Sequence, residues 1–456
     1  MTYPEAIRYL NSLANYEKNI NYSYKETIKL ERVRDFLSLI GNPQKSLRVI
    51  HVAGTKGKGS TCAFMAYILR EAGFCVGLYT SPHLNDFRER IRILCPLVLR
   101  KRSPAKDFEG MISKGALLSL VQELKPVINK YNRQSKYGAL SFFEAYTSIA
   151  FLYFKREQID FAVLETGMGG RLDATNTANS LACGITPVSL EHTQKLGKTL
   201  AKISKEKAGI IKSKGAIVIS ALQNKAAAKV IYNRCKKFQA RFFEVGRQIK
   251  YFKAGPGFTI KGLRKIYKHL RLRLLGAHQM ANASLAVGLV EVLSFYGFNI
   301  GSRAIRKGLY NTIWPGRCEV IQKNPLIILD GAQNLASAQV LRKTIKDNFS
   351  ATNRGGSAFG GRYRKLILVL GISADKDIAG ICRTLSPLAD EIILTRAATS
   401  RAADPEKLAG YFKRKLHLTP SVKEAKLLAK SLAGEKDLIL VTGSLFVAGE
   451  FRDVGR

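Results

Sequence analysis

Apolar residues along the chain follow two patterns that alternate. Short continuous apolar runs, typical of strands buried on both faces, are separated by longer stretches in which apolar residues recur every three or four positions, as on one side of a helix. The expected strands cover residues 47–54, 74–80, 161–166, 182–188, 215–220, 326–331, 366–371, 391–395 and 437–443. The expected helices include residues 61–71, 143–156 and 281–295. This alternation predicts an α/β fold with a mostly parallel sheet.

The length of 456 residues favours two domains rather than one core. Near residues 300–316 the chain contains Gly and Pro and loses its apolar periodicity, and the strand–helix alternation restarts at Leu326. We therefore expect one domain at residues 1–312 and a smaller, Rossmann-like α/β domain at residues 313–456. Residues 350–364 are rich in Gly, Ser and Arg, which predicts a mobile loop.

Composition places the chain among globular proteins, with 46% hydrophobic and 24% charged residues. No run of eighteen apolar residues indicates a membrane-spanning helix, and the polar N-terminus does not resemble a signal peptide, so we expect a cytoplasmic protein. The seven cysteines are scattered and form no CxxC pair. We expect them to be isolated reduced thiols, with neither a zinc site nor a disulfide framework.

A glycine-rich turn between a strand and a helix carries the strongest chemical signal. The strand ends at Ala53, and a helix is expected from Ser60. The glycines between them allow backbone N–H groups to surround phosphate oxygens, while Lys58 is placed to balance the β- and γ-phosphates. The sequence thus predicts a P-loop-type first domain that binds a nucleotide such as ATP through Gly54, Thr55, Lys56, Gly57, Lys58, Gly59, Ser60 and Thr61.

Polar residues follow three other predicted strands. Ser81, Glu165 and His192 each come after a strand end, so in a parallel sheet they converge at its carboxyl edge, where such sheets bind ligands. A hydroxyl and a carboxylate suit Mg²⁺, whereas histidine is an unusual ligand for it.

The motif GTKGKGS (54–60) has one glycine between its lysine and its hydroxyl, and so resembles the folylpolyglutamate synthase/dihydrofolate synthase branch of the Mur ligase superfamily. The resemblance continues in family order and becomes looser after residue 334. The matching segments are YTSPHLNDFRERIRI (79–93), LETGMGGRLDATN (164–176), LEHTQKLGKTLAKISKEKAGIIK (190–212), GAHQMANASLA (276–286), WPGRCEV (314–320) and DGAQN (330–334).

This resemblance implies an ATP- and Mg²⁺-dependent ligase that joins L-glutamate to a folate or dihydropteroate through an acyl phosphate, acting as a monomer with two Mg²⁺ ions. The implied catalytic residues are Lys58, His192 and Lys207, and the resembled family carries the lysine that matches Lys207 as a carbamate. The implied metal ligands are Ser81, Glu165, His192 and Lys207. Further ATP-binding residues would be Asn282, Arg317, Asp330 and Gln333, and the folate site would contain Ser141, Phe143, Asp173 and Ala174.

Two details qualify the resemblance. Gln333 and Leu335 replace the histidine and proline of the family's DGAHNP, which puts the ATP geometry at that point in question. A carbamate on Lys207 requires a neutral amine, so burial or neighbouring cations must lower the pKa of Lys207; Lys205 and Lys212 are the cations that we expect to do so.

The charge of the chain leaves one alternative from a different class. Seventy-four Lys and Arg against 34 Asp and Glu give a net charge of +40, which attracts polyanions. Basic clusters at 100–106 and 262–273 contain few aromatic residues, so we do not expect a specific nucleic-acid site. A basic P-loop nucleic-acid-binding protein stays open as an alternative, and would need a basic face with interleaved aromatics. So does another amino-acid ligase of the Mur superfamily.

Overall fold

The computed structural model describes residues 1–17, 22–96, 108–349 and 363–453 and divides into two compact units. The predicted loop at 350–364 and the basic cluster at 100–106 lie almost entirely outside the described residues. Unit 1 comprises Met1–His83, Phe87–Leu272 and Met280–Thr312. Unit 2 comprises Leu84–Asp86, Arg273–Gln279 and Ile313–Arg456.

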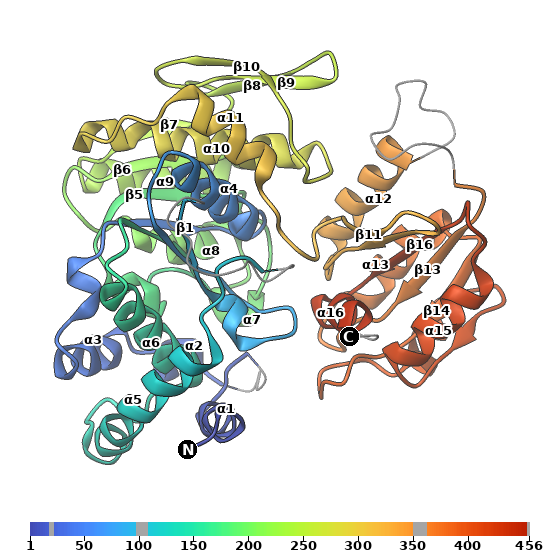
Figure 1. The fold of residues 1–456 in the computed structure, drawn as a ribbon, viewed down its shortest axis with the longest axis horizontal. Coiled ribbons are helices and arrows are strands. Elements are labelled where there is room, and N and C mark those ends of the chain that lie inside the picture. The colour runs from blue at the N-terminus through green and yellow to red at the C-terminus, as the bar shows by residue number, and fades with distance from the viewer. Residues whose placement is uncertain (18–21, 97–107, 350–362, 454–456) are drawn as a thin grey trace. The chain divides into compact units, whose positions relative to one another are not determined.

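Unit 1 is built on a seven-stranded sheet with β1 at its centre (Figure 1). Its strands, in spatial order, are β3 (Ile91–Leu94), β2 (Val76–Tyr79), β4 (Phe161–Glu165), β1 (Val49–Ala53), β5 (Ser180–Ile185), β6 (Ile217–Ser220) and β7 (Arg241–Glu244). All neighbouring pairs are parallel except β2 and β3. Every residue of β1 is buried, because helices cover both faces of the sheet.

The helices of unit 1 are α1 (Tyr3–Ser12), α2 (Tyr24–Thr27), α3 (Leu30–Leu39), α4 (Lys58–Glu71), α5 (Lys114–Gln134), α6 (Phe142–Arg156), α7 (Thr193–Leu196), α8 (Leu200–Lys207), α9 (Lys225–Lys237), α10 (His278–Glu291) and α11 (Ser302–Asn311). The first two residues of α10, His278 and Gln279, belong to unit 2. One face of the sheet is covered by α3, α6, α8 and α9, with α5 packed on α6, whereas α4 and α10 lie over the other face and α11 packs on α4.

Helix α11 contradicts the predicted loss of periodicity near residues 300–316. It buries Ala304, Ile305, Gly308 and Leu309, a helical spacing. The glycine lets α11 approach α4 closely, because a Cβ at Gly308 would lie 2.4 Å from the Cα of Ile68. Sequence inspection missed this stripe because it is short and includes a glycine.

The expectation of reduced cysteines is wrong for one pair. Cys75 and Cys95 form a disulfide across β2 and β3. These strands are antiparallel and place Val76 opposite Leu94, so the residues just outside that pair also face each other. The two cysteines are 20 residues apart in the sequence, and only the strand pairing brings them together. Among the described residues, the other five cysteines are free and buried.

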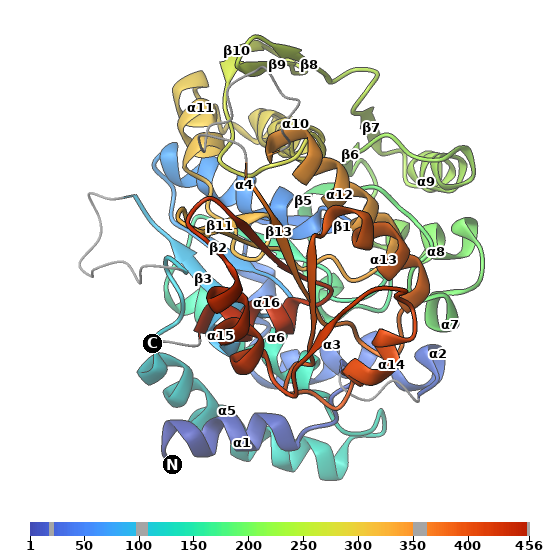
Figure 2. The same ribbon diagram turned by 90° about the vertical axis from the view of Figure 1, so that its right-hand side faces the viewer.

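A separate three-stranded antiparallel sheet belongs to unit 1. It consists of β8 (Lys250–Ala254), β9 (Gly257–Lys261) and β10 (Ile266–Leu270), in the spatial order β10–β9–β8. Figures 1 and 2 show it beside α10 and α11, at the top of the views.

Unit 2 has a six-stranded sheet, all parallel except for β11 and β12. Its strands, in spatial order, are β11 (Glu319–Gln322), β12 (Leu326–Leu329), β16 (Leu438–Thr442), β13 (Leu366–Leu370), β14 (Glu391–Leu394) and β15 (His417–Leu418). Its helices are α12 (Leu335–Phe349), α13 (Ile378–Leu385), α14 (Pro405–Ala409), α15 (Val422–Leu432) and α16 (Leu445–Asp453). The predicted α/β fold with mostly parallel sheets is confirmed. In the part of the chain that the structure describes, no helix is long and apolar enough to span a membrane.

Candidate active site

The glycine-rich turn follows β1 and leads into α4, which begins at Lys58, two residues before the predicted start. Gly54 and Gly57 have φ values of 147° and 85°. A Cβ on Gly54 would lie 1.8 Å from the hydroxyl of Thr186, and one on Gly57 would lie 2.3 Å from the side-chain oxygen of Asn282. Both glycines are therefore required by the close approach of neighbours. The second contact places Asn282, predicted to hold ATP, beside the turn.

A segment after β5 is hydrogen-bonded to the same turn. The backbone N–H groups of Thr55 and Lys56 both donate to the carbonyl of Pro187, at 3.0 and 3.3 Å. The Nζ of Lys56 donates to Oε1 of Glu191 at 2.6 Å. Burial raises the pKa of Glu191, but Lys56 and His192 outweigh it and bring that pKa down to about 2. Sequence reasoning missed Glu191, since only the fold brings it to the turn.

Two of the predicted metal ligands meet at the carboxyl edge of the sheet. The backbone N–H of Ser81 donates to Oε2 of Glu165 at 3.3 Å, and Nζ of Lys58 lies 3.9 Å from Oε1 of the same carboxylate. His192 precedes α7 with a left-handed φ of 51°. That conformation is uncommon for residues other than glycine, although histidine adopts it more often than most.

Hard oxygen donors near the turn fit a divalent cation such as Mg²⁺. Glu165 is buried, and the buried hydroxyl of Thr61 at the start of α4 has no hydrogen-bond partner among the described residues. The same holds for the hydroxyls of Thr166 and Thr186, which follow β4 and β5. In the described ranges, no group of three or more His, Cys, Asp or Glu is arranged so that it could hold a metal ion. A cation here would therefore depend on hydroxyl and phosphate oxygens as well as Glu165.

Lys207, at the end of α8, is buried beside the turn. Only 4% of the residue is exposed, and its Nζ donates to the carbonyl of Gly54 at 2.6 Å. Burial, followed by the charge of Lys58, lowers the pKa of Lys207 to about 7, against a smaller opposing effect of Glu191. Lysines on the phosphate loop, not neighbours on the same helix, thus supply the repulsion.

The expected source of that repulsion, Lys205 and Lys212, was wrong. Lys205 is exposed on α8. The Nζ of Lys212 donates to the carbonyls of Asn176 and Ala178, so it caps a different turn. Side chains two residues apart on a helix point to different sides, so Lys205 and Lys207 do not face each other although they are close in sequence.

Three of the predicted folate residues lie in or against the loop 167–175. Asp173 and Ala174 belong to this loop, and Phe143 packs against it. A Cβ on Gly167 would lie 2.6 Å from the ring of Phe143, so the ring covers this loop closely. Asp173 is buried and accepts hydrogen bonds from the backbone of Met168 and from the backbone and hydroxyl of Thr175. Ala174 is buried in the short turn that follows. Burial raises the pKa of Asp173, against the effect of these donors.

His51 extends this network into β1. Its Nε2 lies 2.8 Å from the hydroxyl of Thr175. Because that hydroxyl donates to Asp173, its oxygen accepts from His51, which assigns the proton to Nε2. Full burial, with a smaller effect of Lys212, lowers the pKa of His51 to about 3, so the imidazole is neutral.

The loop is also tied to the helix that carries Lys207. The guanidinium of Arg171 binds Glu206, with Nε–oxygen distances of 3.1 Å, and the backbone N–H of Arg171 donates to the carbonyl of Glu206. A Cβ on Gly170 would lie 3.0 Å from the carbonyls of Glu206 and Lys207. These contacts fix the loop 167–175 relative to α8.

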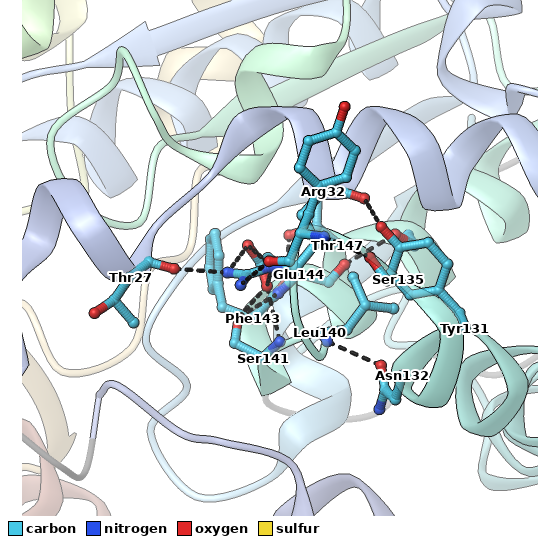
Figure 3. Close-up of polar contacts among 12 residues, drawn as sticks. Thr27, Arg32, Tyr131, Asn132, Ser135, Leu140, Ser141, Phe143, Glu144 and Thr147 are labelled. Carbon is cyan, nitrogen blue, oxygen red and sulfur yellow. Dashed lines mark hydrogen bonds and ion pairs between the residues drawn. The ribbon is translucent and has the colours of Figure 1, made fainter.

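Ser141 has a different local setting, shown in Figure 3. It caps α6: its hydroxyl donates to Oε2 of Glu144 at 2.8 Å, and the backbone N–H of Ser141 donates to the same oxygen. Glu144 in turn accepts from Nε and Nη2 of Arg32, which also donates to the carbonyl of Thr27. The side chain that the sequence predicted to bind folate is thus part of a buried protein network.

The remaining nucleotide candidates belong to unit 2. Asp330 follows β12, and its carboxylate accepts from the backbone N–H groups of Cys318 and Ala332 at 2.9 and 2.8 Å. Burial raises the pKa of Asp330, and Arg317 opposes the increase. Gln333 precedes α12, and its backbone N–H donates to the hydroxyl of Ser337.

Two family models match the chain. The Mur ligase middle domain matches residues 117–290, and the Mur ligase, glutamate ligase domain matches residues 316–445. Fold and phosphate loop together define a Mur-type ligase. The chain is 32% identical over 432 residues to the dihydrofolate synthase/folylpolyglutamate synthase of Bacillus subtilis, which covers 93% of this chain and 94% of that protein. The chain belongs to the folylpolyglutamate synthase/dihydrofolate synthase family.

Solved structures agree with this assignment. A Mycobacterium tuberculosis folylpolyglutamate synthase in complex with ADP matches with a TM-score of 0.85 and 29% identity, covering 100% of this chain and 98% of that one. An FPGS–AMPPCP–folate complex matches with a TM-score of 0.80 and 28% identity, covering 100% and 99%. The expectation of an ATP-dependent ligase that adds glutamate in folate metabolism is confirmed.

Proposed function

We propose that the enzyme adds L-glutamate to dihydropteroate, to the γ-carboxyl group of a tetrahydrofolate, or to both, through an acyl phosphate. The observation that carries this proposal is the arrangement around Gly54–Thr61. Lys58 stands 3.9 Å from Glu165, and the buried Lys207 contacts the turn itself. These cations would surround a transferring phosphate together with backbone N–H groups of the turn other than those of Thr55 and Lys56, which donate to Pro187.

In this reaction a substrate carboxylate oxygen attacks the γ-phosphorus of ATP, and the bond to the β-phosphate oxygen breaks to release ADP. The amine of glutamate then attacks the acyl carbon, inorganic phosphate leaves, and the nitrogen loses a proton to give the amide. Phosphoryl transfer depends on positioning and charge neutralisation. Lys58 and the N–H groups of the turn supply these, while Asn282 would contact the nucleotide.

We assign Ser81, Glu165 and His192 to Mg²⁺ binding, with a second ion near Lys207. When bound, Mg²⁺ would neutralise the β- and γ-phosphate charge. Glu165 supplies the carboxylate, and Ser81 is fixed against it through its backbone N–H. Arg317, Asp330 and Gln333 are assigned to the nucleotide on unit 2.

A carbamate on Lys207 fits its surroundings better than an ammonium. The neutral Nζ would attack the carbon of CO₂ and lose a proton to solvent, which leaves an anion on the side chain. That anion would face Lys58 and Lys56, the two cations that oppose a positive charge at this position. The change of sign turns repulsion into attraction.

The folate would lie against the loop 167–175. The ring of Phe143 is available to pack against a flat heterocycle, and Ala174 lies next to Asp173. Asp173 already accepts several hydrogen bonds, so we propose that it shapes the pocket as well as lining it. For Ser141 we retain a role in the pocket wall, since its hydroxyl is bound to Glu144.

Three further properties complete the proposal. L-Glutamate would be held by unit 2, whose sequence matches a glutamate ligase domain. We propose a monomer that works in the cytoplasm, where ATP is available. Sequence-specific nucleic-acid binding is not part of this function.

An ADP-release assay tests the proposal. Dihydropteroate, tetrahydrofolate and a UDP-muramyl peptide are offered separately, each with and without glutamate. We expect glutamate-dependent ADP release with at least one of the two pterin substrates and none with the muramyl peptide. The reverse pattern would favour the other branch of Mur ligases.

A further inference from the structure

The small sheet of unit 1 has a strongly basic outer face. Residues 245–290 contain nine Lys and Arg and no Asp or Glu, although the whole chain has about one acid for every two bases. Strands β8, β9 and β10 all fall within this stretch. The +40 charge is therefore concentrated locally here, which was not apparent from the sequence clusters alone.

Register separates the two faces of this sheet. Tyr251, Ile260 and Tyr267 form one row across the three strands, and Ile260 and Tyr267 in that row are buried. Because side chains alternate along a strand, the neighbouring row points to the other side. That row consists of Lys250, Lys261 and Ile266. All three of its residues are exposed, so it defines the outer face.

Two apolar side chains stand exposed among these lysines. Ile266 is 56% exposed and Phe252 is 54% exposed. Phe252 lies opposite Thr259 in the row next to Lys250 and Lys261 on the same face. The sequence predicted few aromatics within the basic cluster at 262–273. Pairing of β8 with β9 places Phe252, from outside that cluster, on the same face as Lys261.

Folding alone does not explain this arrangement. Lys250 and Lys261 lie directly opposite each other in an antiparallel pair, where like charges are destabilising. An exposed phenylalanine also adds nothing to the core. Both features become favourable when a polyanion with flat apolar groups covers the face, because the lysines pair with its charges and the ring gains a stacking partner.

We propose that the outer face of β8–β10 binds a single-stranded nucleic acid without sequence preference. Phosphates would contact Lys250 and Lys261, and an unstacked base would pack on Phe252. A duplex fits less well, since its base faces are already stacked and only phosphates reach the surface. None of the residues of this face is among those assigned to ligation.

Fluorescence anisotropy of the full chain with labelled oligo(dT) and oligo(U) tests the proposal. The double variant Lys250→Glu/Lys261→Glu should weaken binding by at least about tenfold and reduce the salt dependence by about 0.7 in log–log slope for each lysine that contacts a phosphate. The matched control is Lys225→Glu/Lys229→Glu, which changes two exposed lysines of α9 and the net charge by the same amount. It should leave affinity within about twofold.

Phe252→Leu separates stacking from charge. It keeps an apolar side chain but removes the flat ring, so affinity should fall about fivefold or more with the salt slope unchanged. Ligase turnover of all variants should equal that of the parent, which shows that they are folded. The proposal is overturned if the α9 control loses as much affinity as the face variant, or if duplex DNA or anionic lipid vesicles bind this face more tightly than the oligonucleotides. Unchanged affinity in Phe252→Leu also overturns it.

Discussion

Arg32 and Lys207 are both cations buried to the same degree, with 4% of each residue exposed, yet their surroundings differ. Arg32 binds Glu144 through two nitrogens and donates to the carbonyl of Thr27, so its charge is compensated (Figure 3). Lys207 makes one contact to a carbonyl and faces two other lysines, which with burial lower its pKa to about 7. A buried charge with an oppositely charged partner usually has a structural role. A buried charge without such a partner indicates a site for a ligand or a modification.

The largest expected effect tests Arg32, the buried cation that has a carboxylate partner. Glu144→Ala leaves Arg32 buried without its carboxylate and should lower the free energy of unfolding by about 3–5 kcal/mol. Denaturant unfolding measures the loss. Glu123→Ala is the control, because Glu123 and Arg156 form an exposed pair and its removal should cost about 0–1 kcal/mol. Equal losses in the two variants would contradict the structural role of Glu144.

The next largest effect concerns Lys58, one of the two lysines that lower the pKa of Lys207. Lys58→Ala removes a cation from the transferring phosphate and should lower turnover about 10²–10³-fold with the fold intact. ADP release under saturating ATP measures this, with circular dichroism as the check on folding. Lys229→Ala, an exposed lysine on α9, should keep parental turnover. Near-normal ADP release by a folded Lys58→Ala would refute the assignment.

The lowered pKa of Lys207 predicts how folding stability changes with pH. Its folded-state pKa of about 7 lies below the ordinary 10.5, so the folded protein binds fewer protons than the unfolded chain between these values, and folding stability should rise with pH across this window. The same neutral amine is the form that captures CO₂. Enzyme stripped of CO₂ should therefore regain activity on adding CO₂ more fully one unit above this pKa than one unit below.

Variants of Lys207 separate the carbamate from the lysine itself. Lys207→Ala should lose most activity and regain part of it with formate or acetate, which can fill the anionic position. Lys207→Arg should not be rescued, because the guanidinium stays charged and occupies the space. Full activity of Lys207→Ala without additive would show that this lysine needs no modification.

The smallest expected effect concerns unit 2. If the side chain of Gln333 contacts ATP, Gln333→His adds a group that can carry charge and should lower the KM for ATP by about fivefold, the value of one modest hydrogen bond. The KM for folate should stay unchanged. Steady-state kinetics with each substrate varied in turn measures both constants. If neither constant moves, Gln333 does not contact the nucleotide.

Much of the fold and part of the site followed from the sequence by itself. Continuous apolar runs located the inner strands of the two large sheets, but not the edge strands β3, β7, β11 and β15 or the small sheet β8–β10. The order strand, glycines, lysine, helix located the turn at Gly54–Thr61, because this signal depends only on residues close in the chain. The meeting of Ser81 and Glu165 also followed, since parallel strands end at one edge.

Only the tertiary structure decided the rest. The partner of Lys56 is Glu191, the disulfide joins Cys75 to Cys95, and Phe252 of β8 lies on the same face as Lys261 of β9. Each of these depends on strand pairing between distant segments, and periodicity does not specify which strands pair or in which register. The pKa of Lys207 is the clearest case: its neighbours in sequence predicted the wrong cations, because desolvation and Coulomb effects depend on distance in space and not along the chain.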